Sequence, residues 1–176
     1  MILGLDISTS IVGATVLTES GEVIYCESWD LRNKNKFPSL FAKAQRVKQM
    51  LAILHDVKKI HFDKVYVEQS LQAFRPGFSS AKTLLTLAKF NGIVSYILER
   101  DFHSTPEYIG ASTARKACGI KVQKGQKAKQ TVLNFLLDNE ESFNVEYTKH
   151  GNPVPGSYDR ADSYIIAKAG LTNLNS

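Results

Sequence analysis

The sequence predicts an α/β fold in which helices cover both faces of a five-stranded mixed sheet whose first three strands are antiparallel. Three observations support this fold class. Short apolar runs separated by turns come first in the chain, helical periods then alternate with short strands, and a hydrophobic fraction of 43% with 22% charged residues is ordinary for a globular protein. A chain of 176 residues falls in the size range of one domain. We therefore expect a single domain over residues 1–176.

Residues 2–29 are expected to form an antiparallel meander. Residues 2–7 are a short apolar run, and residues 11–17 are a second run that is rich in β-branched side chains, so both runs are typical of strands. A polar turn at 19–22 is followed by a third apolar run from Val23 to Cys26. The polar and basic residues 31–38 then predict a loop.

The rest of the chain alternates helices with two short strands. Apolar residues recur every three or four positions from Ser39 to about Lys59 and again from Ser79 to Arg100, which is typical of amphipathic helices. The further elements expected are strands at 64–68 and 108–109, helices at 112–118, 125–137 and 157–169, and loops at 69–78 and 139–156. Three strands followed by this alternation indicate a mixed sheet covered by helices on both faces.

Charge and cysteine content set mild limits on function. Lys and Arg outnumber Asp and Glu by 22 to 17, and a net charge of +5 favours a polyanionic partner. Cys26 and Cys118 lie far apart without a CxxC motif, so we expect reduced thiols, with one disulfide bridge as the alternative. The chain begins without a basic secretion-signal region, and no run approaches the ~18 apolar residues that span a bilayer. We expect a soluble, cytoplasmic protein without a membrane partner.

Four acidic residues are the candidates for chemistry. Asp6 lies in an apolar run, where an acid is costly to bury unless it is paired or bound to a metal; the alternative is that it caps the following turn. Glu68 ends a predicted strand, where sites are often built, although it fits a solvated strand end too. Asp159 and Asp162 share one helical face, but acids just after an N-cap at Ser157 would also stabilise the helix.

Taken together, these acids predict a divalent-metal site. Four oxygen donors without a matching histidine or cysteine cluster suit Mg²⁺ or Mn²⁺ rather than zinc. Two such ions about 3.5–4 Å apart would activate a water and stabilise the leaving oxygen in phosphodiester cleavage. The four histidines show no ligand spacing and are expected on the surface or in loops: His55, His61, His103 and His150. The predicted chemistry is metal-assisted phosphodiester hydrolysis.

The same segments resemble the RuvC-type Holliday junction resolvases of the ribonuclease H-like superfamily, in a phage-like or divergent form. The resemblance covers residues 2–170, and the matching motifs are Gly4-Leu5-Asp6 with Gly13 following, Val67-Glu68-Gln69, Lys89-Phe90-Asn91-Gly92 and Asp159-x-x-Asp162. The ordered set is fairly specific, whereas each motif alone is weak. The resemblance implies a structure-selective endonuclease of DNA recombination and repair, acting in a bacterial or phage-infected cell, with an organellar or viral origin as the alternative. It also implies that Asp6, Glu68, Asp159 and Asp162 are the catalytic metal ligands.

The resemblance further implies a basic surface that contacts DNA. The basic start of the helix near residue 125 matches the part of the family that contacts the scissile phosphate, with Lys129 as the first candidate and Lys127 as the second. Additional phosphate contacts, which add affinity without reading sequence, are expected from Arg115, Lys116, Lys121 and Lys124. For any single lysine, an ordinary solvated position is the alternative.

Two family features are altered in this chain. The frequent Pro-Gly after the first aspartate is replaced by Ile7-Ser8, so a different local turn is expected. An aromatic wedge commonly lies three residues after the glutamate, where this chain has Leu71, with Phe74 beyond it. Phe74 and Arg75 are the candidates to unstack the junction, as apolar wedges do at distorted DNA steps; a core position for Phe74 is the alternative.

The assembly expected from the resemblance is a homodimer on a four-way DNA junction. Cutting two strands related by a dyad makes a two-fold dimer natural. The resemblance places the interface on the helix at 79–100, although the apolar stripe of that helix would also suit packing on the sheet.

Three other functions fit parts of the pattern. Small ribosomal-RNA-processing nucleases share the fold, but they are generally shorter, and the basic stretch at 121–129 together with the long second helix favours the resolvase. The segment 6–10 resembles a phosphate loop of sugar kinases and actin-like ATPases, whose cleft needs two such domains. A catalytically idle binder of branched DNA would gain nothing from four acids facing phosphates.

Overall fold

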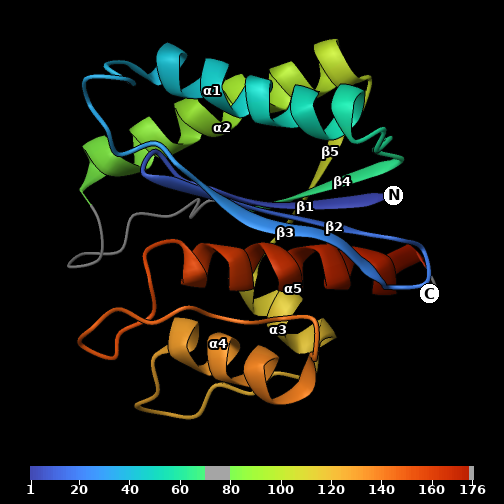
Figure 1. The fold of residues 1–176 in the computed structure, drawn as a ribbon, viewed down its shortest axis with the longest axis vertical. Coiled ribbons are helices and arrows are strands. Elements are labelled where there is room, and N and C mark those ends of the chain that lie inside the picture. Colours follow the sequence, from blue (N-terminus) through green and yellow to red (C-terminus); the bar gives the residue numbers. More distant parts are fainter. Residues whose placement is uncertain (70–79, 175–176) are drawn as a thin grey trace.

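A five-stranded mixed sheet lies at the centre of the molecule (Figure 1). The computed structural model describes residues 1–69 and 80–174, so the wedge candidates Leu71, Phe74 and Arg75 lie outside the described residues. The strand order is β3-β2-β1-β4-β5. The strands are β1 (Ile2–Ile7), β2 (Ile11–Leu17), β3 (Val23–Asp30), β4 (Lys64–Glu68) and β5 (Pro106–Ile109).

The strand directions confirm the expected meander. β1 pairs antiparallel with β2, and β2 pairs antiparallel with β3, whereas β4 runs parallel to both β1 and β5. β1 is therefore the strand at which the antiparallel half meets the parallel half. Every residue of β2 is buried, which accounts for its nearly unbroken run of apolar side chains.

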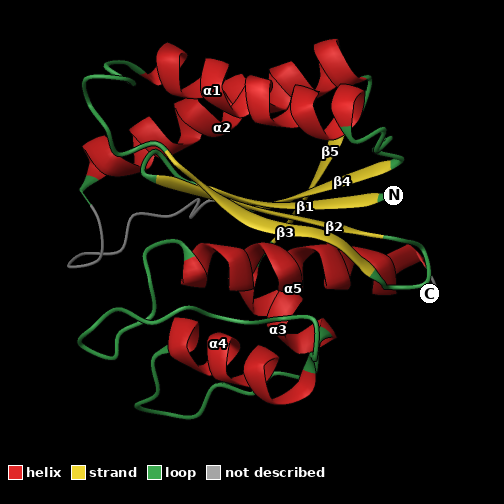
Figure 2. Ribbon diagram, viewed as in Figure 1, coloured by secondary structure: helices red, strands yellow, loops and turns green. Residues whose placement is uncertain are grey.

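Helices cover both faces of the sheet (Figure 2). They are α1 (Leu40–Ala52), α2 (Ala81–Phe102), α3 (Ala111–Ala117), α4 (Ala128–Asn139) and α5 (Ser157–Leu174). α1 and α2 lie on one face and α5 lies on the other, with α3 and α4 packed on the far side of α5 (Figure 1). One apolar core joins α1 and α2 to the sheet, and the other surrounds α5.

The helix expected over residues 39–59 ends differently from the sequence prediction. α1 begins after its N-cap Ser39, but its last turn is the π-helical segment η1 (Ile53–Val57). The Ile60 amide then donates back to the Leu54 carbonyl oxygen at 3.1 Å, and Lys59 takes a positive φ of 57°. Apolar periodicity does not distinguish this wider turn from an α-helical one.

Close packing of α5 on the sheet depends on glycine. A Cβ atom at Gly13 of β2 would overlap the carbonyl group of Asp159, and a Cβ atom at Gly4 of β1 would lie 2.6 Å from the Ser163 carbonyl oxygen. Beside these contacts, the Thr15 and Ser163 hydroxyls are fully buried and hydrogen-bond each other at 2.9 Å. The first turns of α5 therefore lie directly on β1 and β2.

Among the residues that the structure describes, no helix combines the length and apolar character needed to cross a membrane.

Candidate metal centre

Three secondary-structure elements bring acidic side chains to one end of the parallel strand pair. Asp6 lies near the carboxyl end of β1, and Glu68 is the last residue of the neighbouring parallel strand β4. Asp162 comes from α5, one turn after the point where Asp159 packs on Gly13. Because Gly13 is the register partner of Asp6, this packing holds α5 over the carboxyl end of β1.

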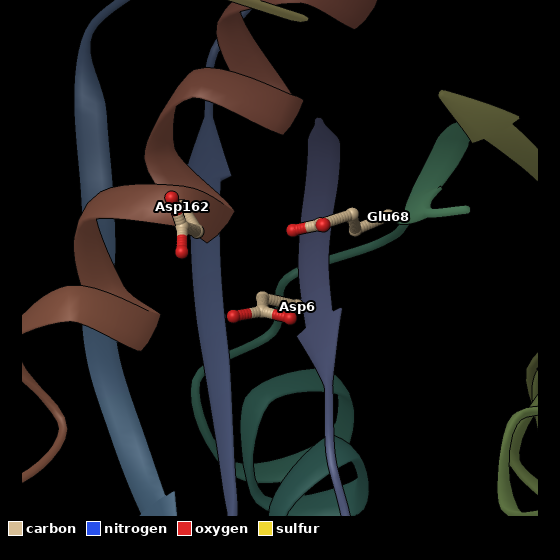
Figure 3. A group of neighbouring side chains, drawn as sticks. All are labelled: Asp6, Glu68 and Asp162. Carbon is tan, nitrogen blue, oxygen red and sulfur yellow. The ribbon is translucent and has the colours of Figure 1, made fainter. Parts of the chain in front are cut away.

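The carboxylates of Asp6, Glu68 and Asp162 face a common space (Figure 3). Each residue offers an oxygen atom, and these oxygens lie within 4.8 Å of one another. Asp162 is only 8% exposed, and Asp6 and Glu68 are partly buried. The fold thus brings together three of the four predicted metal ligands, although Asp6 and Asp162 are 156 positions apart in the sequence.

Asp159 stands at the margin of this group. Among the described residues, the cluster of mutually close oxygens holds Asp6, Glu68 and Asp162 and does not include Asp159. Its negative charge nevertheless reaches the cluster, because Asp159 helps to raise the pKa of Asp6 and of Glu68. A role for Asp159 as a ligand stays a prediction.

The electrostatics of the cluster favour cation binding. Burial, followed by repulsion from Glu68 and Asp162, raises the pKa of Asp6 well above its ordinary value. Burial and repulsion from Asp162 raise the pKa of Glu68 to about 7. Burial also raises the pKa of Asp162 and of Asp159. Without a bound cation, these carboxylates resist ionising together.

One predicted basic residue contacts the cluster directly. Lys129 lies in the first turn of α4, and its Nζ atom is 3.3 Å from Oδ2 of Asp162. Partial burial alone would lower the pKa of Lys129, but the carboxylates of Asp162, Asp6 and Asp159 raise it. Its side chain is still 61% exposed, so the ammonium group also faces solvent.

The other predicted basic residues lie around the loop between α3 and α4. Arg115, Lys116 and Lys121 line a pocket of about 190 Å³ together with Ser112. The charge of Arg115 reaches the acidic centre, since it lowers the pKa of Glu68 and of Asp162 against the dominant effect of burial. Lys124 and Lys127 are exposed, and Lys127 is the N-cap residue of α4.

Two features near the centre were missed by sequence reasoning. Arg32, just after β3, lowers the pKa of Asp159 and is held by Asp30, with its Nε atom 3.0 Å from Oδ1. The only sequence signal for Arg32 was its place in a basic loop after a strand. The buried hydroxyl pair of Thr15 and Ser163 supports α5 next to Asp162, and no pattern in the sequence indicated that pairing.

The donor set fits a hard divalent cation. Oxygens on one octahedral Mg²⁺ ion lie about 2.9–4.2 Å apart for metal–oxygen distances of ~2.0–2.1 Å. The oxygens of this cluster all lie within 4.8 Å of one another, so the three side chains converge closely enough to share one ion. Lys129 is the single ammonium group paired with the cluster among the described residues, which leaves negative charge for a cation to balance.

Comparison with known proteins places this geometry on a known fold. No protein-family model and no curated protein matches the sequence. The structure is similar to that of T. thermophilus RuvC in complex with a Holliday junction substrate, with a TM-score of 0.65, 14% identity, and coverage of 99% of this chain and 94% of that chain. A second Thermus thermophilus RuvC structure matches with a TM-score of 0.62 and 17% identity, and the match covers 99% of this chain and 95% of that one.

A eukaryotic structure gives the same result. The yeast mitochondrial Holliday junction resolvase Ydc2 matches with a TM-score of 0.54 and 19% identity, over 97% of this chain and 77% of that chain. Such low identities carry information about the fold, which agrees with the strand order and the mixed sheet described above. The chain therefore has the ribonuclease H-like fold of RuvC-type junction resolvases over nearly its whole length.

Proposed function

We propose that this chain is a divalent-metal-dependent endonuclease that resolves four-way DNA junctions, with Mg²⁺ as the expected ion, Mn²⁺ as the alternative, and two ions per site. The observation that carries the proposal is the meeting of Asp6, Glu68 and Asp162 within 4.8 Å on the fold of RuvC. Asp159 is proposed as the fourth ligand because it lies next to this cluster on α5. Bound divalent ions would supply water activation and charge neutralisation at the scissile phosphate.

The chain's own residues prepare this reaction in two ways. The three carboxylates are held before any ion binds, since they project from two hydrogen-bonded strands and from a helix packed tightly on them. Lys129 holds its ammonium group beside Asp162 and still faces solvent, so it is the proposed contact to the scissile phosphate. In that position, its charge would stabilise the negative charge that develops on the phosphate during cleavage.

The DNA strand is proposed to run from the acidic centre across the loop between α3 and α4. Arg115 and Lys116 lie at the end of α3, and both line the same pocket as Lys121. Lys124 and Lys127 continue the exposed basic surface toward Lys129. With the acidic side chains gathered at the metal centre, the remaining surface is more basic than the net charge of +5 indicates. Such contacts supply affinity for phosphates without sequence information.

The proposed assembly is a homodimer that uses α2 and the start of α1. Leu40, Phe41, Ile93 and Tyr96 line a largely apolar groove of about 650 Å³ between these helices. Phe41 is 75% exposed, and a Cβ atom at Gly92 in the same groove would meet no other atom within 4 Å. An exposed apolar groove beside a glycine suits close approach of a second helix surface.

A non-catalytic binder of branched DNA is less compatible with this site. Three partly or fully buried carboxylates raise the free energy of the folded chain and repel phosphates, and neither effect helps a protein that only binds DNA. A ribosomal-RNA-processing nuclease would use the same centre, so the substrate must decide between the two activities.

The decisive experiment is a comparison of nucleic-acid substrates. Purified protein is incubated with a synthetic four-way DNA junction, a flap, a linear duplex and a structured RNA, each with Mg²⁺ or with EDTA. We expect paired, symmetric nicks on the junction in Mg²⁺ alone. Preferential cleavage of the structured RNA would replace the proposal with the RNA-processing activity, and binding of the junction without Mg²⁺-dependent cleavage would favour the idle binder.

A further inference from the structure

A pair of histidines lies at the end of α1, away from the acidic centre. His55 belongs to η1, and His61 lies three residues before β4. The Nε2 atom of His55 and the Nδ1 atom of His61 are 3.2 Å apart. Glu68 and its carboxylate are at the other end of β4, so the two sites are separated by the length of that strand.

We propose that His55 and His61 form a second metal site, which binds a divalent transition ion such as Zn²⁺, Ni²⁺ or Cu²⁺. Two imidazole nitrogens on one tetrahedral zinc ion lie about 3.3–3.4 Å apart, given zinc–nitrogen bonds of ~2.0–2.1 Å. The observed separation of 3.2 Å is close to this value before any ion is bound. Imidazole nitrogen favours these ions, whereas Mg²⁺ favours the oxygen ligands of the acidic centre.

Asp56 prepares His55 for this role. Its Oδ1 atom is 2.8 Å from Nδ1 of His55, so Nδ1 carries the hydrogen and Nε2 presents a lone pair toward His61. A carboxylate that accepts from the second ring nitrogen is the usual support of a metal-binding histidine. In the metal-free protein, Nδ1 of His61 donates to Nε2 of His55. Metal binding would move that proton to Nε2 of His61, so that both nitrogens facing the ion have free lone pairs.

The surrounding structure restricts the movement of the His55 ring. The His55 ring packs edge-on against Phe102 at 5.7 Å between ring centroids and lies 6.1 Å from Phe62. The backbone of His61 lies between two buried residues, Ile60 at 4% exposure and Phe62 at 7%, whereas its side chain is exposed and contacts His55. η1 is itself a π-helical turn, a rare conformation that is frequent at functional sites. A ligand held in advance, as His55 is, loses little conformational entropy when an ion binds.

The ion would connect two segments that the chain joins through a tight turn. His55 ends the helical layer on one face of the sheet, and His61 leads into β4. With two protein ligands, the ion keeps open positions for water, so we expect exchangeable binding rather than a permanently bound ion. The expected consequence is a higher thermal midpoint in the presence of the ion, because the ion binds the folded chain.

The test is a titration of the full chain with Zn²⁺ in excess Mg²⁺, so that the acidic centre is already occupied. Calorimetry should give one zinc ion per chain, and imidazole ¹⁵N spectra should show shifts at His55 and His61 but not at His103 or His150. H61A is expected to weaken zinc binding at least tenfold and to abolish the rise in thermal midpoint. H61A changes an exposed side chain, so folding should be retained.

Two further variants complete the design. Asp56→Asn should weaken binding by about tenfold, since loss of a supporting carboxylate costs 10–100-fold in metal affinity. H150A changes an exposed histidine in the loop before α5 and should bind zinc like the unaltered chain. Equal zinc affinity in H61A, or zinc-induced shifts outside His55 and His61, would overturn the proposal. None of these measurements depends on DNA cleavage, so the result stands apart from the proposed nuclease activity.

Discussion

At the scale of single residues, the clustered carboxylates of the acidic centre lower the stability of the folded chain, and a bound cation would remove this effect. Burial raises the pKa of Asp6, Glu68 and Asp162, and repulsion from neighbouring carboxylates adds to this effect, while Lys129 offsets only part of it. Residues that are unfavourable for folding and are brought together from three elements are typical of functional sites. The clustering of buried carboxylates therefore accounts both for the affinity of the site for a cation and for its effect on stability.

Replacing Asp6 by Asn tests the central ligand. We expect Asp6→Asn to reduce junction cleavage in Mg²⁺ by at least about 10³-fold, which corresponds to a loss of ~4 kcal/mol of transition-state stabilisation. Junction binding in Ca²⁺ or EDTA should persist, since the variant removes a ligand and no cationic DNA contact. Cleavage rates and gel-shift affinities measure the two effects separately, and unchanged hydrolysis would contradict the assignment.

The pH dependence of stability tests the environment of Glu68. Its pKa of about 7 in the folded chain exceeds the ordinary 4.5. Between these values, the folded chain holds a proton that the unfolded chain has released, so the stability of the metal-free protein should fall as pH rises. The expected loss is about 1–3 kcal/mol between pH 4.5 and pH 8, followed by urea unfolding in EDTA. Mg²⁺ should restore stability at pH 8 more than at pH 5.

A matched variant identifies the group responsible. Glu68→Gln keeps the size of the side chain and removes its charge, so it should flatten the pH slope and stabilise the metal-free protein at pH 8. It should also abolish cleavage. If the slope is the same in this variant, another group accounts for it.

At the scale of elements, the position of α5 decides whether the centre forms. Its backbone lies directly on Gly4 and Gly13, and Asp159 and Asp162 occupy its first turns. The hydrophobic pattern of α5 alone would permit several rotations about its axis, because most of its residues from 161 to 170 are buried. The glycine contacts and the Thr15–Ser163 hydrogen bond select one of these rotations.

Gly13→Ala tests this packing. The added methyl group would overlap the Asp159 carbonyl, so α5 must shift, and we expect a loss of about 1–3 kcal/mol in stability together with a clear fall in cleavage. Urea unfolding and junction cleavage measure the two losses. Gly110→Ala is the control, because its methyl group would make only ordinary contacts, at 3.7 Å or more, and its φ of −67° suits alanine. Equal stability of the two variants would contradict the packing argument.

The secondary-structure elements were largely predictable from the sequence, whereas the side-chain contacts between them were not. The bounds of β1, β2 and β4 follow directly from apolar runs bounded by polar turns, so Asp6 and Glu68 were recognisable as acids at strand ends. Asp162 was distinguishable from Asp159 only after α5 was docked, since spacing in a helix does not report its rotation. The contact between His55 and His61 depends on the π-helical turn η1, which no periodicity indicated.

At the scale of the whole molecule, the sheet separates the proposed DNA-binding surface from the proposed dimer surface. The acidic centre and the basic loop between α3 and α4 lie with α5, whereas α1 and α2 carry the apolar groove on the opposite face (Figure 1). A dimer built on the groove would thus leave the centre of each protomer accessible to DNA.

Phe41→Glu tests the proposed dimer. Its side chain is 75% exposed in the described chain, so a charge there should leave the fold intact and oppose association. We expect a monomer by analytical ultracentrifugation, together with single instead of paired nicks on the junction. Tyr147→Glu, at an exposed aromatic residue in the loop before α5, should remain dimeric. A variant Phe41→Glu that stays dimeric and nicks in pairs would exclude this groove as the interface.

The order of the three ligands along the chain has a consequence for biosynthesis. Asp6 and Glu68 leave the ribosome early, but Asp162 follows only when α5 has been translated and can dock on β1 and β2. A nascent polypeptide that stalls before α5 holds two of the three clustered carboxylates and has no helix to cover them. If the chain cleaves DNA as proposed, incomplete translation products should be inactive, because the third clustered carboxylate arrives only with α5.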